Sequence, residues 1–345
     1  MHKFISVLLG LLGLAVANAG CSHAPLAAQT SYQFLREIPI GGTGGWDYVS
    51  TDSVARKLYL AHATQIVVVN LDENKITGTI DNTPGVHGLA IAPELSRGFS
   101  SNGKENKVSI VDLATLKTLS KVKVGENPDA IVYESKRQEV YAFNGKSNSV
   151  TILGARSGKV VRTTALPGKP EFAVADSERS QVFVNIEDKH EVVSISTDTH
   201  KITAHFPIAP GETPTGIALD SARGLLFIGC ENQKMILINA TSGKVLDSIP
   251  IGNGVDATAF DPETKLAFSS NGEGSLTIAR VDSNDKLMLI QVLKTERGAR
   301  TLALDLKTHR IYLPTAQFVP QAKDAQGHPK IIDGTQKLLV YELTP

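Results

Sequence analysis

The side chains of this sequence best suited to bind a ligand stand at one recurring position. Intervals of 40, 42, 42, 44, 41 and 44 residues separate Asp47, His87, Asp129, Glu171, Thr215, Asp256 and Arg300. Carboxylates and an imidazole can hold a divalent cation or exchange protons, and a guanidinium can orient an anionic group. Whether these groups can act together depends on the elements that position them.

The repeat that contains them is clearest between Pro214 and Gly252. It consists of four short apolar runs rich in β-branched residues, separated by Gly, Asn, Asp and Ser, which is typical of four strands joined by tight turns. A period near 40 residues with four strands indicates a β-propeller and not a helical solenoid. Seven recurring positions therefore predict an all-β fold, a seven-bladed β-propeller with four-stranded blades.

The two ends of the chain predict how the ring closes. The segment from Phe34 to Gly41 matches the fourth strand of the repeat, whereas Lys337 to Glu342 matches the third strand. We therefore expect the N-terminal strand to complete the last blade, so that residues 32–345 form one closed propeller domain without exposed sheet edges.

Propeller geometry predicts where the recurring residues meet. The innermost strands line a channel, so the connections that precede them should form a ring around one channel mouth. The connections between second and third strands emerge on the same face, and they contain His62, Asn102, Asn144, Asn185, Glu187, Glu231, Asn232, Asn271 and Glu273. In the seventh blade this connection is a long polar loop, Pro314 to Gln336, which we interpret as either a disordered insertion or a functional flap.

Two interpretations of this mouth follow. Each Asp or Asn alone can end a turn and tie blades together through backbone hydrogen bonds. As a set, however, the residues favour a ligand site, and the residues predicted to bind the ligand are Asp47, His87, Asp129, Glu171, Asp256, Arg300, His62, Asn102, Asn144, Asn232 and Asn271. Asp47, Asp129, Glu171 and Asp256 are the candidate ligands of a divalent cation such as calcium.

The first residues predict export. Met1 to Ala19 contains one basic residue, an apolar run and a small-residue cleavage site, as expected of a signal peptide. Residues 20–31 would then be a flexible tether. A second interpretation is lipidation of Cys21, because Gly20-Cys21-Ser22 is similar to the end of a bacterial lipobox. The protein would be periplasmic, attached to the outer membrane as a lipoprotein, or secreted.

A family resemblance supports this interpretation. The segment from Gly211 to Gly252, and Asn127-Pro128-Asp129-Ala130 in an earlier blade, resemble the YVTN-type repeat of YncE-like exported β-propellers. The resemblance extends over residues 32–345, and it implies an exported seven-bladed propeller that binds something on one face.

Two functions remain open. The first is non-catalytic binding of a small molecule, a peptide or a cell-envelope partner at the channel mouth by a monomeric protein. The alternative is a metal-dependent hydrolase, lactonase or lyase at the same mouth. Lys and Arg balance Asp and Glu at 35 each, so nucleic acid is not an expected partner, and membrane contact is expected only through a lipid anchor.

Overall fold

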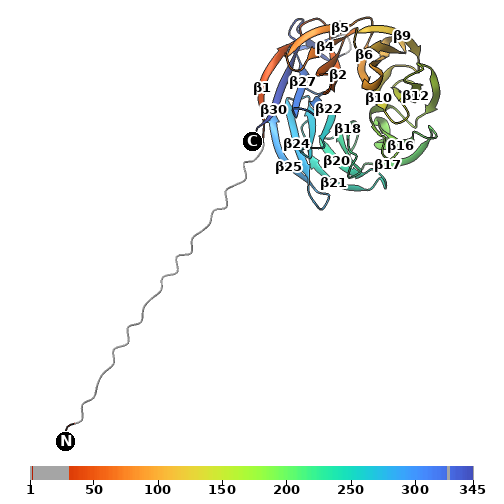
Figure 1. The fold of residues 1–345 in the computed structure, drawn as a ribbon. Coiled ribbons are helices and arrows are strands. Elements are labelled where there is room, and N and C mark those ends of the chain that lie inside the picture. The colour runs from red at the N-terminus through yellow and green to blue at the C-terminus, as the bar shows by residue number, and fades with distance from the viewer. Residues whose placement is uncertain (1, 3–30, 325–326, 345) are drawn as a thin grey trace.

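The computed structural model describes residues 2, 31–324 and 327–344. The predicted signal peptide, apart from His2, and the predicted tether up to residue 30 with Cys21 lie outside the described residues. The described residues form seven four-stranded antiparallel sheets and one two-stranded sheet. The four-stranded sheets are arranged around a common centre (Figure 1), which confirms the predicted seven-bladed propeller.

Six blades follow the chain from the inner to the outer strand. Blades 1 and 2 consist of β2 (Trp46–Asp52), β3 (Lys57–His62), β4 (Gln65–Asn70), β5 (Lys75–Ile80), and β6 (Val86–Ala92), β7 (Arg97–Asn102), β8 (Lys107–Asp112), β9 (Lys117–Lys123). Blades 3 and 4 consist of β10 (Pro128–Glu134), β11 (Glu139–Asn144), β12 (Ser149–Gly154), β13 (Val160–Ala165), and β14 (Pro170–Asp176), β15 (Gln181–Ile186), β16 (Glu191–Ser196), β17 (Ile202–Pro207). Blades 5 and 6 consist of β18 (Pro214–Asp220), β19 (Leu225–Cys230), β20 (Lys234–Asn239), β21 (Val245–Pro250), and β22 (Val255–Asp261), β23 (Leu266–Asn271), β24 (Ser275–Val281), β25 (Leu287–Lys294).

The seventh blade combines the two ends of the chain. Its strand order is β26 (Ala303–Asp305), β27 (Arg310–Thr315), β30 (Lys337–Thr344) and β1 (Ser31–Pro39). The N-terminal strand β1 pairs antiparallel with the C-terminal strand β30 (Figure 1). The predicted closure by the N-terminal strand is therefore confirmed, and Tyr32 and Ile38 of β1 are each 2% exposed.

The core lies between neighbouring blades. The second and third strands have apolar residues on both faces, because each blade packs against one neighbour on each side. The six residues of β19 are all buried, whereas β13, an outer strand, is almost wholly exposed. This explains why the middle strands appear in the sequence as continuous apolar runs without alternation.

Acidic residues stabilise the turns at the far ends of the inner strands. Asp52, at the end of β2, accepts the backbone N–H groups of Val54 and Ala55. Asp305, at the end of β26, accepts two hydrogen bonds from Arg56 Nη1 at 2.8 and 2.9 Å, which tie blade 7 to blade 1. This end of the channel is therefore occupied by structural carboxylates, in contrast to the end where the inner strands begin.

The predicted insertion of the seventh blade contains a β-hairpin. β28 (Phe318–Lys323) pairs antiparallel with β29 (Pro329–Ile331) in the two-stranded sheet. The backbone N–H of Gly334 donates to Gly42 O at 2.7 Å, so the segment is attached to the glycine-rich linker that precedes β2. The described part of the insertion therefore has regular structure, as the functional-flap interpretation requires.

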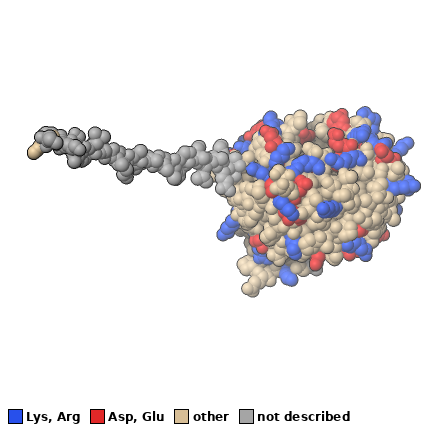
Figure 2. Space-filling view, turned by 90° about the horizontal axis from the view of Figure 1, so that it is seen from below, with Lys and Arg blue, Asp and Glu red and all other residues tan. Residues whose placement is uncertain are grey.

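The remaining regular elements are short. The 3₁₀ helices η1 (Pro93–Leu95), η2 (Gly103–Glu105) and η3 (Glu187–Lys189) shape three connections. Among the described residues, no helix combines the length and the apolar character that crossing a bilayer demands. Basic and acidic side chains are interspersed on the face shown in Figure 2, in keeping with the balanced composition.

Candidate ligand-binding mouth

The recurring side chains are positioned by bulges at the start of the inner strands. Six of the recurring residues are each the second residue of an inner strand: Asp47, His87, Asp129, Glu171, Thr215 and Asp256. This differs from the prediction, which placed them in the connections that precede the inner strands. In each of these strands the pairing register with the second strand shifts at this residue. A β-bulge leaves one residue unpaired and redirects its side chain, which explains how a position inside a strand can face the mouth.

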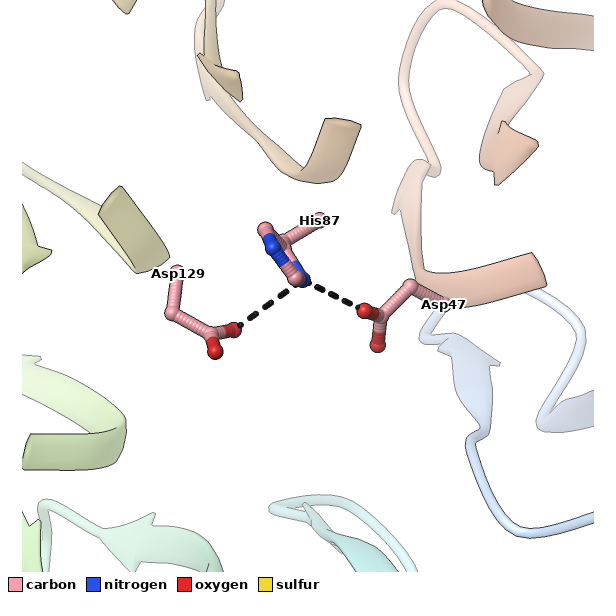
Figure 3. A group of neighbouring side chains, drawn as sticks. All are labelled: Asp47, His87 and Asp129. Atoms are coloured by element: carbon pink, nitrogen blue, oxygen red, sulfur yellow. Dashed lines mark hydrogen bonds and ion pairs between the residues drawn. The ribbon is translucent and has the colours of Figure 1, made fainter. Parts of the chain in front are cut away.

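Three of these side chains from consecutive blades form one cluster (Figure 3). His87 Nδ1 lies 2.7 Å from Asp47 Oδ2 and 3.5 Å from Asp129 Oδ1. The exposed fractions of the three side chains are 22% for Asp47, 24% for His87 and 15% for Asp129. The imidazole therefore bridges two carboxylates that still reach solvent.

This cluster favours a protonated imidazole. Burial lowers the pKa of His87, but the hydrogen bond with Asp47 and the charges of Asp129 and Asp47 outweigh burial and raise it to about 9. Burial raises the pKa of Asp129 to about 6, although the charge of His87 lowers it. At neutral pH the cluster thus consists of an imidazolium whose Nδ1–H donates to Asp47, with a second carboxylate beside it.

Blades 6 and 7 contribute an ion pair. Arg300 Nε donates to Asp256 Oδ2 at 2.7 Å, and Arg300 Nη2 donates to the backbone carbonyl of Trp46 at 3.2 Å. The guanidinium also lies over the Trp46 ring, with Cζ 5.9 Å from the ring centroid. Because Asp47 follows Trp46 directly, this ion pair adjoins the imidazole cluster.

Glu171 of blade 4 makes different contacts. Tyr48 donates its hydroxyl to Glu171 Oε1 at 3.1 Å, and Lys169 Nζ lies 3.4 Å from Glu171 Oε2. Lys169 is paired more closely with Glu187, from the connection between β15 and β16. Burial, and next the charge of Asp129, raise the pKa of Glu171 to about 8. This environment therefore disfavours the charged form of the Glu171 carboxyl relative to an exposed glutamate.

Blade 5 contributes no charge to the ring. Thr215 is 5% exposed and donates its hydroxyl to Val255 O at 2.7 Å. The ionisable residues are therefore unevenly distributed, with the imidazole cluster and Glu171 on blades 1 to 4 and the Asp256–Arg300 pair on blades 6 and 7.

The predicted asparagines form a structural series inside the blades. Asn102, Asn144 and Asn271 are fully buried. Each Nδ2 donates to a hydroxyl on the third strand of its own blade: Asn102 to Ser109 at 2.7 Å, Asn144 to Thr151 at 3.1 Å, and Asn271 to Thr277 at 3.1 Å. These contacts fit the turn-and-tie interpretation better than ligand binding.

The two other predicted residues of this face have local roles. Asn232 Nδ2 donates to Pro210 O at 2.9 Å and so links two loops. His62 is 2% exposed at the end of β3, and burial lowers its pKa. Its ring is so close to Gly42 that a Cβ there would lie 2.6 Å from His62 Cε1. The structure does not bring either side chain into the charged network.

Tyr48, Lys169 and Arg297 contribute to the mouth or its surroundings but were not among the predicted site residues. Tyr48 follows Asp47 directly and Lys169 lies two residues before Glu171, so proximity in sequence was the available signal. Trp46, Arg297 and Phe318 line a cavity of about 480 Å³ beside the ring, below the β28–β29 hairpin. No sequence spacing indicated this cavity, because its walls come from blades 6, 7 and 1 together with the insertion.

Among the described residues, one group at the mouth has a geometry suited to a metal ion. One ligand atom from each of Asp47, His87 and Asp129 can be chosen so that all lie within 4.8 Å of one another. The predicted four-carboxylate set is not assembled, since Asp256 is paired with Arg300 and Glu171 contacts Lys169. His87, which was not among the metal candidates, takes their place.

Comparison with known proteins identifies the class of fold. No family model and no curated protein matches the chain. Among solved structures, the RRP9 WD40 repeats align with a TM-score of 0.76 at 10% identity, covering 91% of this chain and 100% of that chain. A chain of Kuenenia stuttgartiensis hydrazine synthase aligns with a TM-score of 0.71 at 15% identity, covering 84% and 95%.

A third solved structure, of a mitotic checkpoint complex, aligns with a TM-score of 0.76 at 13% identity and covers 99% of both chains. At such identities these likenesses show the fold alone. The chain is a seven-bladed β-propeller with WD40-like structural neighbours.

Proposed function

We propose that this chain is a YncE-like, YVTN-type exported propeller that binds a small molecule, a peptide or a cell-envelope partner at the channel mouth without catalysing a reaction. Export as a periplasmic, lipid-anchored or secreted monomer is part of this proposal. The mass of the mature N-terminus tests it, because cleavage before Gly20 and a lipidated Cys21 give different masses.

The observation that carries the binding function is the side-chain network at the start of the inner strands. Asp47 and His87 bond to each other across blades, as do Asp256 and Arg300. Carboxylates that merely stabilise turns accept backbone N–H groups, as Asp52 does at the other end of the channel. A concave mouth at which partly exposed polar groups from several blades converge is where ligand sites are generally built.

The double variant Asp129→Asn/Glu171→Gln tests this assignment. A thermal-shift screen with amino acids, sugars, short peptides and organic acids should yield compounds that raise the Tm of the wild type and not that of the double variant. Asp81→Asn/Glu178→Gln, which changes two exposed acids elsewhere, is the matched control. Compounds that stabilise the double variant as much as the wild type would place the site elsewhere.

The metal-dependent hydrolase, lactonase or lyase stays a second candidate because of the Asp47–His87–Asp129 geometry. An imidazole nitrogen with two carboxylates suits a borderline transition metal such as zinc or iron, whereas calcium prefers oxygen ligands throughout. The bound ion would replace the imidazolium proton and polarise a substrate carbonyl.

Elemental analysis of gently purified protein separates the two candidates. The metal candidate requires a stoichiometric transition metal that His87→Gln and Asp47→Asn both lose, and a Tm that falls with EDTA. Metal-free protein whose Tm and ligand binding are unaffected by chelator would exclude it and leave the non-catalytic function.

A further inference from the structure

The cavity beside the ring has properties that the charged network does not explain. It lies below the β28–β29 hairpin, is about 480 Å³ in volume and is lined by Trp46, Phe318, Arg297 and Arg300. This volume lies within the range of small-molecule sites. Gly298, with φ of +88°, keeps part of the wall open, since a Cβ there would lie 2.6 Å from the Phe318 ring.

The aromatic walls are each accompanied by a guanidinium. The rings of Trp46 and Phe318 lie 6.2 Å apart between centroids, at an angle of 54°. Arg297 Cζ lies 5.5 Å from the Phe318 centroid, and Arg300 Cζ lies 5.9 Å from the Trp46 centroid. Such stacking orients a guanidinium without using up its N–H donors.

These walls offer donors that nothing else in the described chain accepts. Arg300 commits Nε to Asp256 and Nη2 to Trp46 O, whereas Arg297 makes no ion pair with any described carboxylate. The N–H groups of these two arginines that have no acceptor among the described residues can therefore donate to an anionic group in the cavity.

The hairpin side of the cavity does not cancel this charge. Asp324 and His328 also line it, and they contact each other, with His328 Nδ1 3.8 Å from Asp324 Oδ2 and His328 N donating to Asp324 Oδ1 at 2.9 Å. Since Arg300 is already paired with Asp256, and Asp324 contacts His328 on its own hairpin, Arg297 is the guanidinium of this cavity without an ion-pair partner among the described residues.

We propose that this cavity binds the anionic part of a planar aromatic ligand, a carboxylate or a phosphate held by Arg297 and Arg300, with the ring against Trp46 and Phe318. This inference rests on the proposed function and names the ligand class of the same mouth. The planar guanidinium fork matches both anions bidentately, and aromatic walls select a flat ligand over an aliphatic one.

The chain carries its own reporter for this proposal, because Trp46 is its single tryptophan. Benzoate and phenyl phosphate are the anionic probes, benzyl alcohol and benzylamine the uncharged and cationic aromatic controls, and acetate the non-aromatic anion. Binding is followed by Trp46 fluorescence and by calorimetry. We expect benzoate or phenyl phosphate to bind at least about tenfold more tightly than any control, since a charge-assisted pair of hydrogen bonds discriminates by that order.

Arg297→Gln tests the residue assignment. Because Arg297 is exposed, its substitution should leave the Tm unchanged and weaken the anionic probe about tenfold. Arg162→Gln, on the exposed outer strand β13, is the matched control and should bind like the wild type. Phe318→Leu should weaken benzoate while leaving any acetate binding unchanged, which separates the aromatic wall from the charge.

Three results would overturn the inference: no binding of either anionic probe at millimolar concentration, benzylamine or benzyl alcohol binding as tightly as benzoate, or Arg297→Gln behaving like Arg162→Gln. None of these results would refute the proposed function of ligand binding at the channel mouth, which is tested separately with the Asp129→Asn/Glu171→Gln variant. Conversely, the anionic probes could bind in the cavity while the screening hits still bind the double variant. That result would refute the assignment of the mouth and support the cavity as the binding site.

Discussion

The charge state of His87 leads to a prediction that can be worked through from the structure. Its pKa is about 9, against an ordinary value of 6.5. At about 1.4 kcal/mol for each pKa unit, the protonated imidazole stabilises the folded protein by about 3 kcal/mol. Because the pKa is raised in the folded state, this contribution is fully present below about pH 6.5 and disappears as the pH rises through about 9.

The same sign applies to the neighbouring acids. The folded protein also raises the pKa of Asp129 to about 6 and that of Glu171 to about 8. It therefore holds protons more tightly than the unfolded chain over this range, so the free energy of unfolding should fall with rising pH in the wild type. Contributions of all three groups point in one direction, which makes the slope a clear observable.

Two measurements test this reasoning. The free energy of unfolding, measured in urea at about pH 6.5 and about pH 9, should be lower in His87→Gln than in the wild type by most of about 3 kcal/mol at the lower pH. At the higher pH the two proteins should differ little. His328→Gln, on the exposed hairpin, is the control. An NMR titration should place the inflection of the His87 imidazole near 9. An inflection at the ordinary value, or a variant penalty independent of pH, would refute the imidazolium between two carboxylates.

Three further outcomes follow from the fold. Deleting residues 31–41 removes β1 and exposes the edge of β30, so the whole ring should lose cooperative unfolding in calorimetry and gain aggregation; an unchanged transition would contradict the closure. Asp305→Ala removes the two bonds to Arg56 Nη1 while Arg56 Nε stays paired with Asp72; losing charged hydrogen bonds should cost about 1.5–3 kcal/mol in urea unfolding, whereas a loss under about 1 kcal/mol would assign the Asp305 pair no structural weight. Asn271→Ala removes the buried amide that bonds to the hydroxyls of Ser269, Ser275 and Thr277 and should cost about 2–3 kcal/mol while binding of the screening hits stays intact; a binding loss without a stability loss would return Asn271 to the site.

The fold could be predicted almost completely from the sequence. The period of the recurring residues fixed the number of blades, and the mismatch between the two chain ends predicted the strand pair β1–β30, because ring closure depends only on which strand type each end resembles. The ring was predicted in outline for the same reason: six inner strands begin at equivalent points, so equivalent positions must meet.

The roles within the ring could not be predicted in this way. Asn102, Asn144 and Asn271 share a repeat position at the expected face, but their amides turn inward to hydroxyls on the third strand. A recurring residue that stabilises its own blade cannot be distinguished in the sequence from one that binds a ligand. The position of Glu171 against Tyr48 and Lys169 likewise depends on a bulge, which spacing alone does not show.

The imidazole cluster and the aromatic cavity meet at two consecutive residues. The carbonyl of Trp46 holds Arg300, whereas the carboxylate of Asp47 holds His87. A ligand confined to one region should therefore respond to Arg297→Gln or to Asp129→Asn/Glu171→Gln, but not to both. For a ligand that spans both regions, the loss of binding free energy in the variant with all three substitutions should differ from the sum of the separate losses. Groups that share one bound molecule and one backbone segment are coupled.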